Sequence, residues 1–297
     1  MGPAKNDISL LIDEKIASNK NAILRVGSSP RPPMNSLRPK AHLSDVQMQQ
    51  FRDQGYVILG RVLSDSELED LRREEGRFRA NARVPGSQKS QTLFFSQVCP
   101  YSEVVRHVGT TGAQLDAMQQ LIGPNVMLWY TQFVTKMPDG MSGKSEFPWH
   151  QDNGYVSIEP ATNVTVWIAL DDVDTRNGCV WIDPKSHLKG LLPHKKKSAD
   201  SWFLEIKVEG DGVPAVLKAG EAIAFTGLTL HRSKLNQTDS PRRAFFFEYC
   251  DPASVAIPMG DYHGNAAQAP RTPVIQRAGT WLARGQLPLP PENKFEV

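Results

Sequence analysis

The chain of 297 residues has only three cysteines, Cys99, Cys179 and Cys250, and no CxxC pair. Three widely spaced cysteines predict neither a disulfide framework nor a cysteine-rich zinc module, and they favour a reduced setting inside the cell. The sequence also lacks an apolar run long enough for a signal peptide or a membrane span. Asn6 occupies the position at which N-myristoylation requires Ser or Thr. We therefore expect a soluble, cytoplasmic protein.

An excess of charge of one sign is absent as well. The chain has 34 Lys and Arg against 32 Asp and Glu, which leaves a net charge of +2. No basic stretch is interleaved with aromatic residues, so nothing predicts a nucleic-acid partner. Hydrophobic residues make up 40% of the chain and charged residues 22%, as in ordinary globular proteins. These features predict no membrane partner, and they give no oligomeric state.

The first part of the chain predicts an extension followed by helices. Residues 1–42 contain a Gly- and Pro-rich stretch that breaks regular structure, so we expect an N-terminal extension before a single domain over residues 43–297. Two capping boxes, of the Ser-x-x-Gln and Ser-x-x-Glu type, predict helices over residues 44–54 and 64–79. A strand is expected between them at residues 56–59.

The middle of the chain predicts a mainly β fold. Residues 81–101 are polar and indicate a loop, and residues 102–121 indicate a pair of helices or one kinked helix, interrupted by glycine. Many short strands separated by Gly and Pro turns then predict a β-sandwich or a jelly roll. Of these we favour the double-stranded β-helix (jelly roll), with its core at about residues 125–250 and the helices flanking it. After residue 251 we expect irregular structure, with a possible helix over residues 272–284. The expected strands cover residues 126–134, 163–170, 178–182, 202–208, 215–217, 221–225, 230–233 and 244–249.

A metal site is predicted from His150 and Asp152 in the segment Phe147–Tyr155. In an extended segment, residues two apart project from the same face, so both side chains can bind one metal. His231, in the later strand expected at residues 230–233, can supply a third ligand. Two His and one carboxylate form the facial triad of non-haem Fe(II) oxygenases. The same set suits catalytic zinc, so a metal-dependent hydrolase remains an alternative, as does a catalytically idle binding module.

Arg242 follows His231 by eleven residues and begins a predicted strand. A buried guanidinium suits two-pronged binding of the far carboxylate of a dicarboxylic acid. The neighbouring Arg243 could take this role if the strand register slipped by one residue. A hydrolase needs no such arginine, so this position favours the oxygenase.

In these features the sequence resembles the phytanoyl-CoA dioxygenase (PhyH) family of Fe(II)- and 2-oxoglutarate-dependent oxygenases. It differs at Met137, where the family commonly has Pro. The resemblance implies Fe(II), 2-oxoglutarate as co-substrate and O2. It extends from about residue 43 to 250 and is carried by residues 43–56, 123–125, 136–139, 150–152, 166–170, 177–179, 186–187 and 231–242.

The resemblance also implies roles for individual residues. Arg242 and a hydroxyl would pair with the distal carboxylate of 2-oxoglutarate, and an amide and an indole would line the same pocket. The histidines outside the triad are expected to be structural or solvated, His194 in a solvated loop, and Lys136 at the mouth or in solvent. The residues at matching positions are His150, Asp152 and His231 for the metal and Gln132, Trp167, Ser233 and Arg242 for the co-substrate.

The implied reaction is hydroxylation, or another oxidation, of a C–H bond in a small-molecule metabolite, with release of succinate and CO2. Halogenases of this superfamily have Ala or Gly at the carboxylate position, and Asp152 fills it here. We therefore expect oxygen insertion, desaturation or demethylation. The loops over residues 83–97, 139–145 and 190–201 are expected to cover the open end of the barrel. They form no long apolar groove, which favours a compact polar acid of secondary metabolism over a fatty acyl chain.

Overall fold

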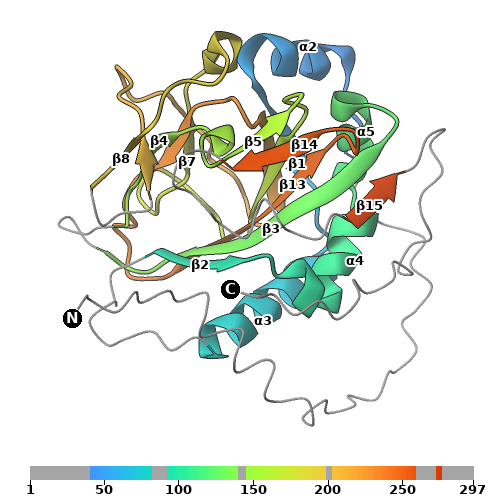
Figure 1. Cartoon of the computed structure of the whole chain (residues 1–297). Coiled ribbons are helices and arrows are strands. Elements are labelled where there is room, and N and C mark those ends of the chain that lie inside the picture. The colour runs from blue at the N-terminus through green and yellow to red at the C-terminus, as the bar shows by residue number, and fades with distance from the viewer. Residues whose placement is uncertain (1–40, 82–91, 140–144, 199–202, 259–271, 276–297) are drawn as a thin grey trace, which may run out of the picture.

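The computed structural model describes residues 41–81, 92–139, 145–198, 203–258 and 272–275 (Figure 1). Its first elements are helix α2 (Asp45–Gln54), strand β1 (Tyr56–Arg61) and helix α3 (Asp65–Asn81). Both predicted capping boxes are present, because Ser44 and Ser64 each exchange hydrogen bonds with the residue three positions later. Helix α2 ends at Gly55, whose φ of 83° favours glycine.

A strand and three helical segments follow: β2 (Thr92–Ser96), the short 3-10 helix η2 (Cys99–Tyr101), α4 (Glu103–Thr111) and α5 (Gln114–Ile122). The predicted helix pair is thus confirmed, with its break at Gly112. The prediction of a loop over residues 81–101 is wrong where β2 forms. This strand pairs with the longer strand over residues 126–136, which supplies its backbone hydrogen-bond partners.

The rest of the chain is mainly strand, as predicted, although several strands are shorter than expected and others were missed. The remaining elements are β3 (Val126–Lys136), β4 (Phe147–His150), η3 (Asp152–Gly154), β5 (Val156–Glu159), β6 (Val164–Ala169), β7 (Val180–Ile182), η4 (Ser186–Lys189), β8 (Lys195–Lys196), β9 (Leu204–Glu205), β10 (Val213–Pro214), β11 (Glu221–Thr226), β12 (His231–Ser233), β13 (Arg242–Cys250), β14 (Val255–Pro258) and β15 (Thr272–Ile275).

Two antiparallel sheets form the two walls of a jelly roll. The larger has seven strands in the order β1-β11-β6-β13-β3-β15, with β2 also paired to β3. The smaller has four strands in the order β10-β7-β12-β4. Strands β14 and β5 form a separate pair, as do β8 and β9. This arrangement confirms the predicted fold class.

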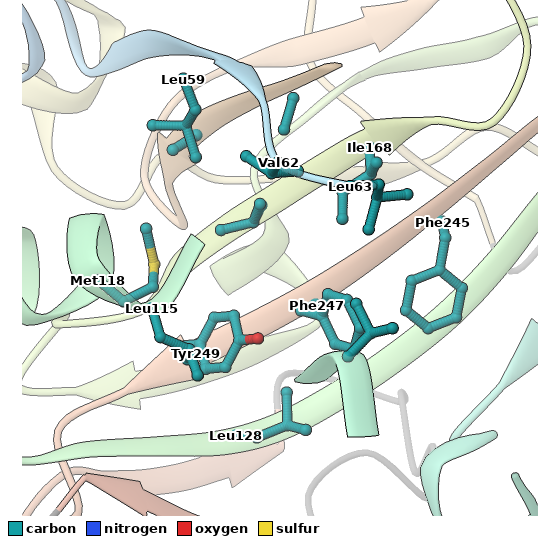
Figure 2. Close-up of a cluster of buried hydrophobic side chains, with 14 of the residues drawn as sticks. Leu59, Val62, Leu63, Leu115, Met118, Leu128, Ile168, Phe245, Phe247 and Tyr249 are labelled. Carbon is teal, nitrogen blue, oxygen red and sulfur yellow. The ribbon is translucent and has the colours of Figure 1, made fainter. Parts of the chain in front are cut away.

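Helices α3, α4 and α5 cover the outer face of the large sheet, where the main hydrophobic core lies (Figure 2). Strand β13 sends Phe245, Phe247 and Tyr249 to this face, and they are completely buried. Because side chains alternate along a strand, the residues between them point to the opposite face, toward the small sheet. The inner face of the large sheet is therefore the wall on which ligands can be held.

The C-terminal part differs from the sequence expectation. Strand β14 pairs with β5, and β15 pairs with β3, where irregular structure and a helix were expected. Residues 215–217 form no strand; Leu217 makes an isolated bridge to Val173. The expected extension, except its last two residues, and most of the loop at residues 139–145 lie outside the described residues. Within them, no helix is long and apolar enough to cross a membrane.

Candidate metal and co-substrate site

The structure brings together the three residues of the predicted metal triad, His150, Asp152 and His231. One potential ligand atom from each lies within 4.8 Å of the others. The Nε2 atoms of His150 and His231 lie 3.7 and 3.5 Å from Oδ1 of Asp152. The two histidines are paired across strands β4 and β12 of the small sheet. Nitrogen and oxygen ligands at this spacing suit a divalent metal such as iron or zinc.

The sequence had suggested that His150 and Asp152 project from one face of a strand, and this is wrong. Strand β4 ends at His150, and Asp152 begins the 3-10 helix η3. Thr165 of the large sheet donates a hydrogen bond to Oδ2 of Asp152 at 2.7 Å, which leaves Oδ1 toward the histidines. The turn of η3, and not strand alternation, therefore brings the carboxylate to the metal site.

Local geometry also orients the two imidazole rings. Nδ1 of His150 lies 2.8 Å from the carbonyl oxygen of Pro148, and Nδ1 of His231 lies 3.1 Å from that of Thr229. A carbonyl can only accept, so each Nδ1 carries the proton and each Nε2 lone pair is available to a metal. Burial, followed by the charge of His231, lowers the pKa of His150 well below its usual range. Burial therefore favours the neutral form of His150, which is the form of an imidazole that binds a metal.

Arg242 lies on the inner face of β13 and is almost completely buried. Within the described residues, its Nε and Nη1 have no hydrogen-bond partner. Burial lowers the pKa of Arg242 to about 10, which still leaves the guanidinium charged at neutral pH. A buried charge without a partner is costly, and an anionic ligand would remove that cost. Arg242 is therefore suited to hold a carboxylate.

Arg243 is excluded from this role by its position on the other face of β13. It forms an ion pair with Asp171, with Nη2 at 2.5 Å from Oδ1 and Nε at 3.0 Å from Oδ2. The possible slip of register by one residue does not occur. Its guanidinium is already neutralised and half-exposed, so it has no need of a ligand.

The other residues expected around the co-substrate occupy different parts of the inner surface. Ser233 follows His231 on β12 and shares its face, because both pair regularly with β7. The ring of Trp167 lies 5.4 Å from the Arg242 guanidinium carbon. Gln132 lies further along the sheet, and its amide donates to the hydroxyls of Ser96 and Tyr130. Trp167 therefore lies beside Arg242, Ser233 is on the same strand face as His231, and Gln132 is engaged elsewhere.

Lys136 is neither solvated nor at the mouth of the barrel, contrary to the expectation. It is completely buried opposite Arg242, to which it is paired across β3 and β13. Its ammonium donates to the carbonyl oxygens of Ser145, Ser233 and Lys234, at 2.5 to 3.0 Å. Burial lowers the pKa of Lys136 well below its usual range. This lysine joins the end of β12 to the segment before β4.

Two residues next to the metal triad were missed or misassigned from sequence. The buried side chain of Gln151 donates to the carbonyls of Gly190 and Leu228 and accepts from the Leu192 amide. His194 accepts a hydrogen bond from the Gln151 amide at 3.0 Å. It is therefore packed against the metal-binding segment and not in a solvated loop. Its partners lie about 40 residues away in sequence, so no local pattern could reveal them.

Aromatic side chains line one side of the metal triad. The ring of Phe147 lies 4.5 Å from that of His150, and the rings of Phe94 and Phe203 lie 5.7 and 4.6 Å from Phe147. Phe147 and His150 face the same side because β4 has an irregularity opposite β12 that places two residues between them. The wall formed by these three phenylalanines is an apolar surface beside the metal site.

A carboxyl group, Glu248, is also buried on the inner face of β13. Nδ2 of Asn163 donates to its Oε1 at 2.5 Å, and β13 places it opposite Thr165. Burial, followed by the charge of Asp152, raises the pKa of Glu248 to about 8. Nothing in the sequence around Glu248, which lies between aromatic residues of a strand, marked it as a functional candidate.

Comparisons with known proteins agree with this geometry. A family model, phytanoyl-CoA dioxygenase (PhyH), matches residues 51–244. The peroxisomal phytanoyl-CoA dioxygenase of Bos taurus is 24% identical over 235 residues, 70% of this chain and 69% of the bovine one. Among solved structures, the non-heme alpha ketoglutarate dependent carbocyclase SnoK from nogalamycin biosynthesis matches with a TM-score of 0.63 at 22% identity, covering 81% of this chain and 97% of that one.

A second solved structure shares the fold. The epimerase SnoN, in complex with Fe3+, alpha ketoglutarate and nogalamycin RO, matches with a TM-score of 0.61 at 23% identity. The match covers 78% of this chain and 94% of SnoN. At these identities the two solved structures establish a common jelly-roll architecture.

Proposed function

The chain belongs to the phytanoyl-CoA dioxygenase family, and from that premise we propose how its own residues carry out an Fe(II)- and 2-oxoglutarate-dependent oxidation. The substrate is a small-molecule metabolite whose C–H bond is oxidised, with release of succinate and CO2. The observation that carries the proposal is one inner surface with a three-residue metal group and a buried arginine, two nitrogen atoms of which lack a hydrogen-bond partner among the described residues.

His150, Asp152 and His231 would hold the iron. The carbonyls of Pro148 and Thr229 fix the proton on each Nδ1, and Thr165 fixes the carboxylate, so the three ligands are oriented before the metal arrives. Iron bound there supplies the activation of O2 and the oxidative decarboxylation of the co-substrate. Three ligands from one side leave the opposite side for small molecules.

Arg242 would bind the distal carboxylate of 2-oxoglutarate, with Ser233 adding a hydroxyl and Trp167 an apolar wall. Lys136 would act as a positioning residue. Its ammonium donates a hydrogen bond to the carbonyl oxygen of Ser233 and would thereby hold Ser233 near Arg242. We assign Gln132 a more distant part of the same pocket, since its amide is engaged by Ser96 and Tyr130.

The alternatives fit the inner surface less well. A metal-dependent hydrolase can use the triad but has no use for a buried guanidinium without a partner. An idle binding module would need Arg242 and has no need of a complete metal group. The presence of both features favours the oxygenase.

We propose hydroxylation or a related oxidation as the reaction type. Asp152 occupies the coordination position that a halogenase leaves to chloride. Turnover in chloride-containing buffer is therefore expected to yield only oxidised products by mass spectrometry. A chlorinated product from the parent enzyme would contradict this assignment.

The surroundings of the triad bear on the substrate class. The wall of Phe94, Phe147 and Phe203 offers an apolar face that the loop sequences did not predict. We propose a compact metabolite, of the secondary-metabolism type, with one apolar face. A carboxylate on it stays a prediction, because residues 82–91, 140–144 and 199–202, in the loops on which that expectation depended, lie outside the described residues. The three free, buried cysteines support a reducing compartment, for which we propose the cytoplasm.

An anaerobic titration tests the proposed function directly. Adding Fe(II) and then 2-oxoglutarate to the metal-free protein should produce, at one equivalent each, the visible charge-transfer absorption of a chelated 2-oxo acid. Succinate should appear when O2 is admitted. Zn(II) should bind without this absorption and should give no succinate. Failure of the absorption to form with Fe(II) would reject the proposed function.

A further inference from the structure

The inner face of β13 carries an arginine at one end and a carboxyl group at the other. Arg242 and Glu248 alternate with Ala244 and Phe246 on this face, while Phe245 and Phe247 pack on the outer face (Figure 2). Arg242 and Glu248 are six positions apart, or about 20 Å along the backbone. A five-carbon diacid that extends from Arg242 toward the metal has no positive group to offer Glu248, so the acidic end is left for another molecule.

Two partly exposed aromatic rings lie between these two ends. Strand β13 lies in the interior of the large sheet, flanked by β3 and β6, yet Phe246 is only partly buried. Phe245 and Phe247 on the outer face are completely buried. Tyr130, whose ring stacks on Phe246 at 5.7 Å, is partly exposed as well. The inner face near Phe246 is therefore packed less completely than the outer face, and the two rings can contact a ligand.

Glu248 has no countercharge among the described residues, since no lysine, arginine or histidine there forms an ion pair with it. Its exposed fraction is 4%, and the side-chain amide of Asn163 donates a hydrogen bond to it. The charged group that influences it is Asp152, which has the same sign. Ionising a buried carboxyl in this setting costs free energy, and a cationic ligand beside it would offset that cost.

The position of Glu248 relative to the metal group is also defined. Glu248 pairs with Thr165 on β6, and Thr165 holds Asp152 by a hydrogen bond. The carboxyl therefore lies at the level of the metal triad, one strand away from the residue that fixes its carboxylate ligand. A molecule bound between Glu248 and the aromatic rings would be next to the metal.

We propose that Glu248 binds a protonated amine of the substrate, with Tyr130 and Phe246 contacting the carbon skeleton beside that amine. This inference rests on the proposed function and deepens it, because it names the group by which the substrate is oriented. The two ends of β13 then bind different molecules: Arg242 binds the diacid, and Glu248 binds the amine of the substrate. An ammonium also gains from the faces of the two rings, toward which cations are attracted.

Three probes of similar size test this proposal: phenethylamine, 2-phenylethanol and 3-phenylpropionate. Each is titrated anaerobically into the Fe(II)- and 2-oxoglutarate-bound protein, and the change in the charge-transfer absorption is followed. We expect the amine to bind at least about tenfold more tightly than the alcohol, and the carboxylate to bind most weakly. The Glu248→Gln variant keeps the shape of the side chain and should abolish the preference for the amine.

The matched control is Glu209→Gln, which removes an exposed carboxylate between β9 and β10 and should leave the preference intact. The absorption before any probe is added reports whether iron and 2-oxoglutarate bind; its absence would reject the proposed function, not this inference alone. If the absorption forms but the amine gives no saturable change, the proposal is wrong. It is equally wrong if the probes bind alike or if Glu248→Gln keeps the preference for the amine.

Discussion

The two faces of strand β13 differ in whether their side chains find partners within the protein. On the outer face, Phe245 and Phe247 are completely buried, and the hydroxyl of Tyr249 donates to the Gly109 carbonyl and accepts from Gln114. Arg243, on the same face, is neutralised by Asp171. Every one of these side chains finds its partner within the protein. The outer face can therefore form completely as the chain folds.

The inner face of the same strand is incomplete in the protein alone. Arg242 has two nitrogen atoms without a hydrogen-bond partner among the described residues, and Glu248 has no countercharge there. Residues one position apart thus contribute to stability on one side and to ligand binding on the other. Burial alone therefore does not identify a residue of the structural core. A buried residue belongs to the core when its polar atoms are hydrogen-bonded within the protein, and it is a candidate for ligand binding when they are not.

The largest effect is expected at the metal group. Replacing His231 with alanine removes one of three ligands, so Fe(II) should no longer bind at one equivalent per chain. The measurement is the iron content of the purified protein after equilibrium dialysis. His42→Ala, which removes an exposed histidine, should bind iron like the parent. If His231→Ala bound Fe(II) as tightly as the parent, the triad would be wrongly assigned.

Substitution of adjacent phenylalanines separates the two faces by stability. Phe247→Ala should lower the free energy of unfolding by about 3–5 kcal/mol, because a ring is lost from the closed core. Phe246→Ala should cost less, since its side chain is only partly buried. Urea unfolding of the two variants measures the difference. Equal losses would mean that the inner face is packed as tightly as the outer one.

Substitution of adjacent arginines separates the faces by affinity. Arg242→Leu should raise the KM for 2-oxoglutarate about 30-fold to several thousand-fold, since losing a buried charge partner costs about 2–5 kcal/mol. Arg243→Leu removes only a half-exposed ion pair, worth about 1 kcal/mol or less, and should leave this KM nearly unchanged. Succinate formation at varied 2-oxoglutarate gives both values. A rise confined to Arg243→Leu would transfer the role to that residue.

Much of the fold and the metal triad could be predicted from sequence, because both depend on the alternation of apolar residues along strands and on the spacing of motif residues. The capping boxes at Ser44 and Ser64 place the first helices, and the apolar strands from residue 126 onward give the jelly roll. His150, Asp152 and His231 could be matched by type and order alone. Even so, the predicted reason for the proximity of His150 and Asp152 was wrong, since a 3-10 turn begins at Asp152.

The residues that sequence could not assign depend on partners far away in the chain. Lys136 is buried because three carbonyls converge on it, two of them from residues nearly 100 positions later. His194 is placed by the Gln151 amide, and Glu248 by Asn163. Tertiary contacts of this kind leave no periodic signal. A buried polar residue of a strand therefore looks the same in sequence as a solvated one.

The smallest expected effect concerns two buried thiols on opposite sides of the large sheet. Burial raises the pKa of both Cys99 and Cys179 to about 11. The thiolate is the reactive form, so alkylation by iodoacetamide should be slow at pH 8, and its rate should rise about tenfold per pH unit until the pKa is approached.

The Arg242 charge lowers the pKa of Cys179, whereas Arg106 has this effect on Cys99. A diacid bound to Arg242 should therefore raise the pKa of Cys179 and slow its alkylation a few-fold, leaving Cys99 unchanged. Peptide mass spectrometry with Fe(II), with and without 2-oxoglutarate, measures both rates, and equal slowing at the two cysteines would place the co-substrate away from Arg242.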